Sequence, residues 1–303
     1  MMTRTHHRIN ALIVDMDNTL YDWVSYFVPA IQAMLNVAAR LLNVSDHVLR
    51  ADLRAVHVAH GNTEHPFALL ETRTVRQSLP DLDVKQRHAV LLPAFAAFNT
   101  IRNDRLHLYP GVDETLRSIR ATGCRVIGHT EATDVNIASR ARMLGLSTTL
   151  EAIYAPRLAN APHPLGDAAE RSPGTGVPIQ PLPADARKPN PTIASWIADQ
   201  TGVPVARCLY VGDSLAKDIA MASDAGMKTA WARYGLHHDP QLWSTLVELS
   251  HWDGTSVASA EHRNPSVITA TPDVTLNSFP EILDHFAFIS PTTTQPAVES
   301  GGG

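Results

Sequence analysis

Residues 9–22, INALIVDMDNTLYD, decide the fold of this chain. Positions 11–14 form a short apolar run that stops abruptly at Asp15, a residue that the interior of a β-sheet rarely accommodates. This pattern indicates a buried parallel strand that ends at a carboxylate. Because open α/β sheets bind their ligands at the carboxyl ends of the strands, Asp15 and Asp17 are placed for chemistry.

Strand and helix patterns alternate in the second part of the chain and predict an α/β fold with a doubly wound parallel sheet. We expect strands at 125–128, 153–154, 208–211, 228–232 and 274–276. We expect helices at 112–122, 134–144, 190–201, 215–225 and after Ser278, where Glu281 would complete a capping box. Residues 23–106 contain helical patterns only, at 27–42, 45–60, 66–78 and 83–102.

These patterns predict two domains. The α/β core would comprise residues 1–22 and 107–288, with a helical domain of residues 23–106 inserted after the first strand. Two stretches, 155–187 and 236–272, lack a clear period; long loops of this kind are lids, small subdomains or disordered segments. We favour partial disorder for the first stretch, and we expect a disordered tail at 289–303.

Composition excludes several classes of protein. The 303 residues carry 25 Lys and Arg against 30 Asp and Glu, so there is no basic excess for nucleic-acid binding. No stretch approaches the ~18 apolar residues of a membrane span, and the chain starts without the apolar region of a signal peptide. Cys124 and Cys208 lie at apolar strands and are expected to be buried free thiols. We therefore expect a cytoplasmic protein that binds neither nucleic acid nor membrane.

Four separated motifs resemble, in order, those of the haloacid dehalogenase-like (HAD) hydrolases. They are DMDNTL at 15–20, Thr130 after the strand at 125–128, RKPNP at 187–191, and YVGDSLAKD at 210–218. Asp-x-Asp alone is weak evidence, but four motifs in register identify the chain as a member of this family. It is similar to the phosphatases with a C1 cap, of the phosphoglycolate phosphatase and nucleotidase type. The resemblance implies a Rossmann-like core and makes residues 23–106 the helical cap.

The resemblance also implies the catalytic roles. Asp15 would be the nucleophile that forms an aspartyl-phosphate, and Asp17 the acid for the leaving group and then the base for water. Thr130 and Lys188 would bind the phosphoryl oxygens. Each residue also has a simpler structural interpretation: the acids and Thr130 as caps at strand ends, and Lys188 as a solvated loop residue.

A metal ion follows from the same resemblance. An attacking carboxylate needs a cation to offset the negative charge of a phosphoryl group. Asp15, the main-chain carbonyl of Asp17, and Asp213 would bind Mg²⁺, which prefers a few oxygen ligands and keeps several waters. Asp218 would support this site indirectly. The same ligands accept Mn²⁺, so the sequence does not choose between the two ions.

Several histidines stay open to more than one interpretation. His129 would face either the site or the sheet, and we favour a structural role. In the cap, His57, His60, His65 and Glu64 crowd a loop that could reach over the site, but irregularly spaced histidines are more often surface residues. The pair at 237–238 is interpreted in the same way, and Arg187 as a surface residue.

We predict a Mg²⁺-dependent hydrolase of small phosphomonoesters, acting on a small phosphorylated metabolite. Dehalogenases of the family lack an acid at the position of Asp17, and a cap that covers the site favours small substrates. One alternative is a phosphomutase that passes the phosphoryl group to a second hydroxyl. Another is a non-catalytic binding protein on the same scaffold. The sequence leaves the substrate and the oligomeric state open.

Overall fold

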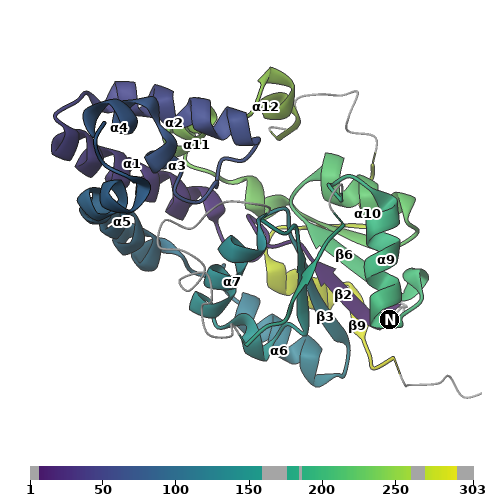
Figure 1. Cartoon of the computed structure of the whole chain (residues 1–303). Coiled ribbons are helices and arrows are strands. Elements are labelled where there is room, and N and C mark those ends of the chain that lie inside the picture. The colour runs from purple at the N-terminus through teal and green to yellow at the C-terminus, as the bar shows by residue number, and fades with distance from the viewer. Residues whose placement is uncertain (1–6, 159–175, 184–185, 261–269, 292–303) are drawn as a thin grey trace, which may run out of the picture.

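The computed structural model describes residues 7–158, 176–183, 186–260 and 270–291. Within these residues, seven parallel strands form one sheet in the order β5-β4-β3-β2-β6-β7-β8. Helices cover both faces of this sheet, and a second group of helices stands at its carboxyl edge (Figure 1). The predicted α/β, doubly wound parallel sheet is confirmed.

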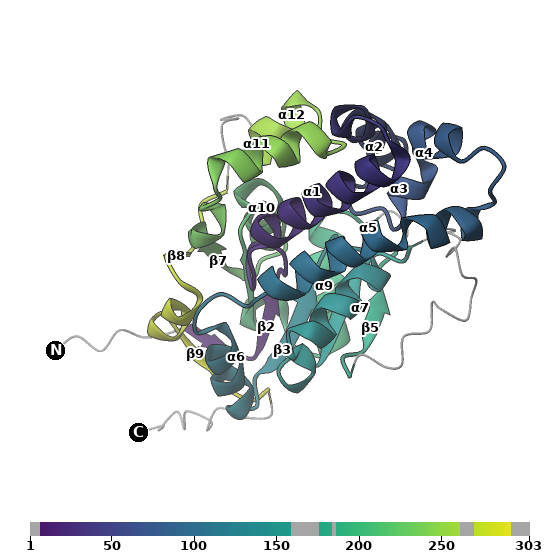
Figure 2. The ribbon, with the colours of Figure 1, turned by 90° about the vertical axis from the view of Figure 1, so that its left-hand side faces the viewer.

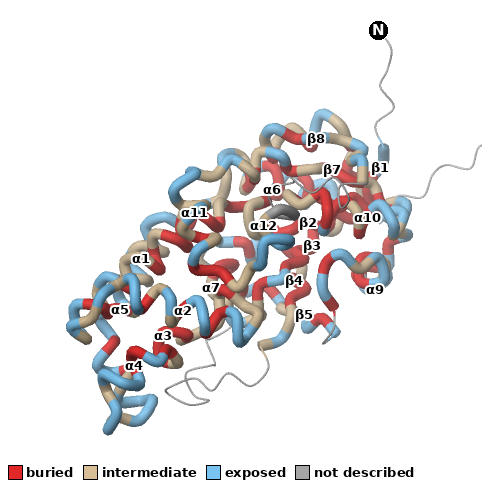
Figure 3. Tube along the Cα trace, turned by 90° about the horizontal axis from the view of Figure 1, so that it is seen from above, coloured by how far each residue is buried: buried red, intermediate tan, exposed pale blue. Residues whose placement is uncertain are grey.

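The strand formed by the apolar run lies at the centre of the sheet. Val14 pairs with Gly128 on one side and with Val211 on the other, so the chain leaves the sheet between two neighbouring strand ends. The strands are β2 (Ala11–Val14), β3 (Arg125–His129), β4 (Ala152–Ala155), β5 (Ile179–Pro181), β6 (Cys208–Gly212), β7 (Lys228–Ala232) and β8 (Val274–Leu276). The central strands β2, β3 and β6 are almost entirely buried, whereas the edge strands β5 and β8 are partly exposed (Figure 3).

Alternate residues of β2 face two separate cores, as a sheet covered on both faces requires. Leu12 and Val14 pack in the core that includes α6 (Val112–Ala121) and α7 (Asp134–Met143). Ile13 packs on the opposite face with residues of α9 (Pro191–Thr201) and α10 (Ala220–Asp224). Short helical turns complete the core at η1 (Leu146–Thr148), η2 (Val205–Arg207), η3 (Leu215–Ile219), η4 (Arg233–Leu236) and η5 (Phe279–Asp284).

Two predicted core helices differ in type. The helix expected at 215–225 begins with the wider π-helical turn η3 and becomes α-helical only in α10. The helix expected after Ser278 is a 3₁₀ turn, and Ser278 makes no capping bond to its backbone. Instead, the Glu281 carboxylate accepts the backbone N–H of Asn277 at 2.9 Å. The predicted capping box therefore does not form.

The segment between β2 and α6 is helical, as predicted. Its helices are α1 (Trp23–Leu42), α2 (Asp46–His60), α3 (Ala68–Glu71), α4 (Arg73–Ser78) and α5 (Val84–Arg105). Asp83 and Gln86 form a capping box at the start of α5. The single helix expected at 66–78 is wrong: Thr72 has an extended backbone, and its hydroxyl accepts the Val75 N–H to start a new helix. The exact domain boundaries stay a prediction.

The two aperiodic stretches contain regular structure that the sequence did not show. β5 forms inside the first stretch and extends the sheet beside β4. The disorder predicted there falls on residues 159–175 and 184–185, which lie outside the described residues. The second stretch contains α11 (Pro240–Leu249) and α12 (Gly254–Ala260). α11 lies along α1 and α2, so it joins the helices of the cap (Figure 2).

The ends of the core also pair. β1 (His7–Ile9) runs parallel to β9 (Phe286–Phe288), and Ile289 donates its N–H to the Ile9 carbonyl at 2.9 Å. Asn10 binds the carbonyls of Ile289 and Ser290, so the first residues of the predicted tail are ordered against the core. The rest of that tail, from residue 292, lies outside the described residues.

Two compositional predictions can be compared with the structure. Cys124 and Cys208 are buried and free, as predicted, and burial raises the pKa of each thiol to about 12. Among the described helices, no single one has the length and apolar character to cross a membrane; α1 and α2 meet that test only together, with a bend of 119° between them. The cytoplasmic location stays a prediction.

Candidate active site

The centre of the site is Asp15, directly after β2. Its side chain is buried, and its two oxygens have different partners: Oδ1 accepts the Lys188 ammonium at 2.5 Å, and Oδ2 accepts the Thr19 hydroxyl at 3.1 Å. Lys188 also donates to Asp218 at 2.8 Å and to the His129 carbonyl at 3.3 Å. One buried cation therefore joins the ends of β2 and β3 to the turn after β6.

Three carboxylates meet around this lysine. Asp15, Asp213 and Asp218 each offer an oxygen, and these atoms all lie within 4.8 Å of one another. Gly212 makes the approach possible, because a Cβ at this position would lie 2.4 Å from the Asp218 carboxylate. The second oxygen of Asp218 accepts the Ser214 N–H at 3.1 Å, so both of its oxygens have partners in the protein.

The electrostatics of the cluster follow from burial and crowding. Burial, together with Asp218 and Asp17, raises the pKa of Asp15 to about 7, although Lys188 opposes the shift. Burial, together with Asp15 and Asp218, raises the pKa of Asp213 well above its usual value. Burial by itself would lower the pKa of the Lys188 ammonium, but the nearby carboxylates of Asp15 and Asp218 have the larger effect and raise it. Lys188 is therefore a permanent cation, and within the described residues no other cation forms an ion pair with the three carboxylates of this cluster.

Thr130 lies at the end of β3, next to β2, where the motif predicted it. It is buried, its backbone N–H donates to the Tyr154 carbonyl at 3.0 Å, and its hydroxyl oxygen accepts the Ala132 N–H at 3.0 Å. The hydroxyl hydrogen is then available for another acceptor. The neighbouring His129 is buried with its ring 2.9 Å from the Tyr210 hydroxyl, as expected for a structural histidine.

Asp17 occupies the rim of the site, and its partner was not predicted. The Arg140 guanidinium donates to the Asp17 carboxylate and, through its other amino nitrogen, to both oxygens of Glu64 at 2.5 Å. Trp23 donates its indole N–H to Glu64 at 2.9 Å. Arg140 is buried and comes from α7 of the core, and Glu64 is half-buried and comes from the cap, so this chain of ion pairs joins the cap to the motif at 15–20.

The loop that carries Asp17 is held from the other side by η4. Tyr234 donates its hydroxyl to the Thr19 carbonyl at 2.6 Å. Asn18 has a positive φ of 59°, and its carbonyl oxygen would lie 1.9 Å from a Cβ at Gly235. Only glycine permits this approach, so residues after β7 also fix the geometry of the motif.

The surface interpretation of the cap histidines is correct for His60, which is exposed, but wrong for His57, which is buried, and His65 is half-buried. His57 is buried, and its Nδ1 lies 2.7 Å from the Leu249 carbonyl of α11. The rings of His60 and His65 stack with centroids 3.5 Å apart, and each places Nε2 2.8 Å from Glu71. His238 is partly buried against Trp243. Arg187 is exposed, as predicted.

With this geometry in view, a family model described as haloacid dehalogenase-like hydrolase matches residues 9–226. The chain belongs to this family. The match spans all four motifs and confirms the family and the hydrolase class that they predicted. The roles of the individual residues stay predictions.

Two curated relatives of the chain are phosphatases by name. It is 29% identical over 253 residues to N-acetylmuramic acid 6-phosphate phosphatase of Pseudomonas aeruginosa, covering 80% of this chain and 92% of the relative. It is 28% identical over 237 residues to glyceraldehyde 3-phosphate phosphatase of Methanopyrus kandleri, covering 76% and 87%. A solved 2-haloacid dehalogenase from Pseudomonas syringae shares the fold, with a TM-score of 0.54, 20% identity, and coverage of 91% and 97%.

Proposed function

We propose that this HAD-like hydrolase cleaves small phosphomonoesters through an aspartyl-phosphate on Asp15, with the help of Mg²⁺. The observation that carries the proposal is the buried Asp15 carboxylate, bound by Lys188 and surrounded by Asp213 and Asp218. The names of the two phosphatase relatives support phosphate esters as the substrates.

In the first step, an oxygen of Asp15 forms a bond to phosphorus while the bond from phosphorus to the ester oxygen breaks. The electron pair of that bond leaves on the ester oxygen, and Asp17 supplies its proton. In the second step, Asp17 takes a proton from water, and the resulting hydroxide attacks phosphorus. Inorganic phosphate then leaves, and the Asp15 carboxylate is restored.

Fixed charges around Asp15 would support both steps. The ammonium of Lys188 already touches Asp15, and a phosphoryl oxygen placed there would find a buried cation that needs no reorganisation. The Thr130 hydroxyl can donate to a second phosphoryl oxygen from the end of β3. Arg140 holds the Asp17 carboxylate at the rim, where the ester oxygen would lie.

The carboxylate set fits a divalent cation. Burial and the neighbouring carboxylates raise the pKa values of Asp15 and Asp213 although Lys188 lowers both, and this supports a further cation at the site. Asp15, Asp213 and the main-chain carbonyl of Asp17 would hold Mg²⁺, with Asp218 acting through Lys188 and the Ser214 N–H. When bound, the ion supplies the charge that offsets repulsion between Asp15 and the phosphoryl group.

Phosphate release from p-nitrophenyl phosphate and a panel of small phosphoesters, with and without Mg²⁺, tests the proposal. Asp15→Asn should lower the rate of phosphate release by at least about 10³-fold, because no nucleophile remains. Asp17→Asn should slow it by about 10²- to 10⁴-fold, and less for p-nitrophenyl phosphate, whose leaving group needs no acid. Phosphate exchange between substrates without net release would indicate the phosphomutase alternative, and no turnover of the whole panel the non-catalytic one.

A further inference from the structure

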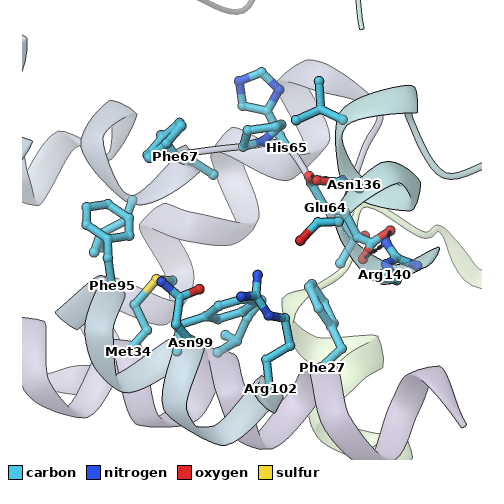
Figure 4. A pocket seen from close by; sticks show the side chains of 18 of the residues that line it. Phe27, Met34, Glu64, His65, Phe67, Phe95, Asn99, Arg102, Asn136 and Arg140 are labelled. Atoms are coloured by element: carbon cyan, nitrogen blue, oxygen red, sulfur yellow. Dashed lines mark hydrogen bonds and ion pairs between the residues drawn. The ribbon is translucent and has the colours of Figure 1, made fainter. Parts of the chain in front are cut away.

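A cavity of about 750 Å³ lies between the cap and α7 of the core. Its walls come from α1, the segment after α2, α5 and α7. They are mainly apolar, and aromatic rings dominate the cap side: Tyr26, Phe27, Phe67, Phe95 and Phe98. Figure 4 shows these walls around an open centre. A cavity of this size and lining suits an organic molecule rather than a few waters.

The backbone of the cap is strained where it builds this wall. Phe67 has a positive φ of 58°, which is rare for a bulky residue. Its ring meets those of His88 and Phe95 with centroids 5.7 and 5.6 Å away. Strain of this kind persists where the surrounding structure holds a side chain in a required place, often at a ligand site.

Three arginines, Arg102, Arg140 and Arg142, bring positive charge to the lining of the cavity. Arg140 is fully engaged with Asp17 and Glu64. Arg102 of α5 forms no ion pair with a carboxylate among the described residues; its guanidinium binds only the Asn103 side chain, at 3.2 Å, and stands 6.0 Å from the Phe98 ring centre. Arg142, which is exposed, lines the cavity and likewise forms no ion pair within the described part of the chain.

Arg102 is half-buried in the cavity wall, where water screens its charge less than on an open surface. Burial, with Arg140 and Arg142 nearby, lowers the pKa of its guanidinium. In Figure 4, Arg102 and Asn99 extend from α5 into the cavity, opposite Phe67 and His65. Arg102 is therefore a half-buried cation beside two others that forms no ion pair within the described residues, and its guanidinium can pair with an anion that those residues do not supply.

We infer that this cavity binds the leaving group of the substrate, and that this group has an apolar or aromatic body and an anionic substituent, such as a carboxylate, which pairs with Arg102. The inference rests on the proposed function, whose substrate class it specifies. Glu64 and Arg140 line the cavity and also form the chain of ion pairs to Asp17. The phosphoryl group would lie at Asp15, the ester oxygen at Asp17, and the remainder beyond Arg140. Arg142 at the rim would strengthen the attraction for the anion.

A matched pair of substrates tests this inference: phenyl phosphate and 4-carboxyphenyl phosphate, which differ by one carboxylate. The wild type should show a kcat/KM about 10-fold or more higher for the carboxylated ester, the value expected for one charge-assisted hydrogen bond. Arg102→Met should bring the ratio close to one, mainly by raising KM for the carboxylated ester. Arg105→Met, an exposed arginine of the same helix outside the cavity, should leave the ratio unchanged.

A binding measurement separates this inference from the proposed function. 1-Anilinonaphthalene-8-sulfonate combines an aromatic body with an anion, and its fluorescence reports binding without turnover. Arg102→Met and Arg102→Gln should each weaken its binding about 10-fold, while Arg105→Met should not. If neither these two esters nor the wider panel is hydrolysed, the proposed function fails and this titration alone decides whether the cavity is an anion site. Equal kcat/KM for the two esters, or dye binding that ignores Arg102, overturns the inference.

Discussion

The carboxyl ends of the strands and the cavity under the cap differ in whether their charged side chains have partners of opposite charge. At the strand ends, Lys188 contacts the buried carboxylates of Asp15 and Asp218. Each of these three residues belongs to a short sequence motif beside a strand or a helix. In the cavity, aromatic rings surround Arg102, which has no carboxylate partner among the described residues. We infer from this difference that the proposed catalytic groups are assembled before substrate binds, whereas Arg102 would gain its anionic partner only from a ligand.

The strongest test of this contrast is Lys188→Met. Removing the cation leaves the buried carboxylates of Asp15 and Asp218 without their cationic partner, so we expect the free energy of unfolding to fall by about 3 to 5 kcal/mol in metal-free buffer. Lys217→Met is the control, because its ion pair with Glu131 is solvent-exposed and should contribute less than about 1 kcal/mol. Urea denaturation measures both. Equal losses would show that the strand-end cluster is no more tightly coupled than the surface.

His57, in the cavity wall, tests the other side of the contrast. Burial, reinforced by His251, His65 and His60, lowers its pKa from 6.5 to about 4, despite the hydrogen bond to the Leu249 carbonyl. The unfolded chain therefore binds this proton first, and stability should be complete above pH 6.5 and decline by about 3 kcal/mol towards pH 4.

The variant His57→Asn keeps a donor for the carbonyl and removes the titration, so its melting temperature should depend less on pH in this window. His47→Asn, an exposed histidine of the same helix, is the matched control and should behave like the wild type. Thermal unfolding from pH 7 to pH 4 measures the effect. A wild-type slope retained in His57→Asn would place the pH dependence elsewhere.

The smallest effect is expected where the two regions meet. The buried Arg140 and the half-buried Glu64 form an ion pair between core and cap, so a double-mutant cycle with Glu64→Gln and Arg140→Met should give a coupling energy of about 2 kcal/mol. Of the two single variants, Arg140→Met should cause the larger loss of stability, since it leaves both Glu64 and Asp17 without their cationic partner. Unfolding of the four proteins in urea supplies the cycle. Additive losses would show that cap and core are held by packing instead.

Much of the core and its site was predictable, because the relevant signals are local. An apolar strand that ends at Asp15 shows itself in a few residues, as does the strand that ends at Gly212 and Asp213. The helical breaks were harder: Thr72 divides a predicted helix because its hydroxyl caps the second half, and propensity alone does not reveal this choice. α11 was missed although Asp239 and Pro240 form a good start signal, because its apolar pattern is short.

The sequence alone determined the order of strands and helices, the family, and the carboxylates and lysine at the strand ends, because each depends on neighbours a few residues away. Only the tertiary structure decided that Arg140 pairs with Asp17 and Glu64, that His57 is buried, and that Arg102 faces an apolar cavity. The contact of Arg140 with Asp17 joins residues 123 positions apart, and that of His57 with Leu249 joins residues 192 positions apart, across helices whose relative placement no local pattern encodes. Burial sets the chemical environment of each of these side chains, and burial depends on the packing of the whole folded chain.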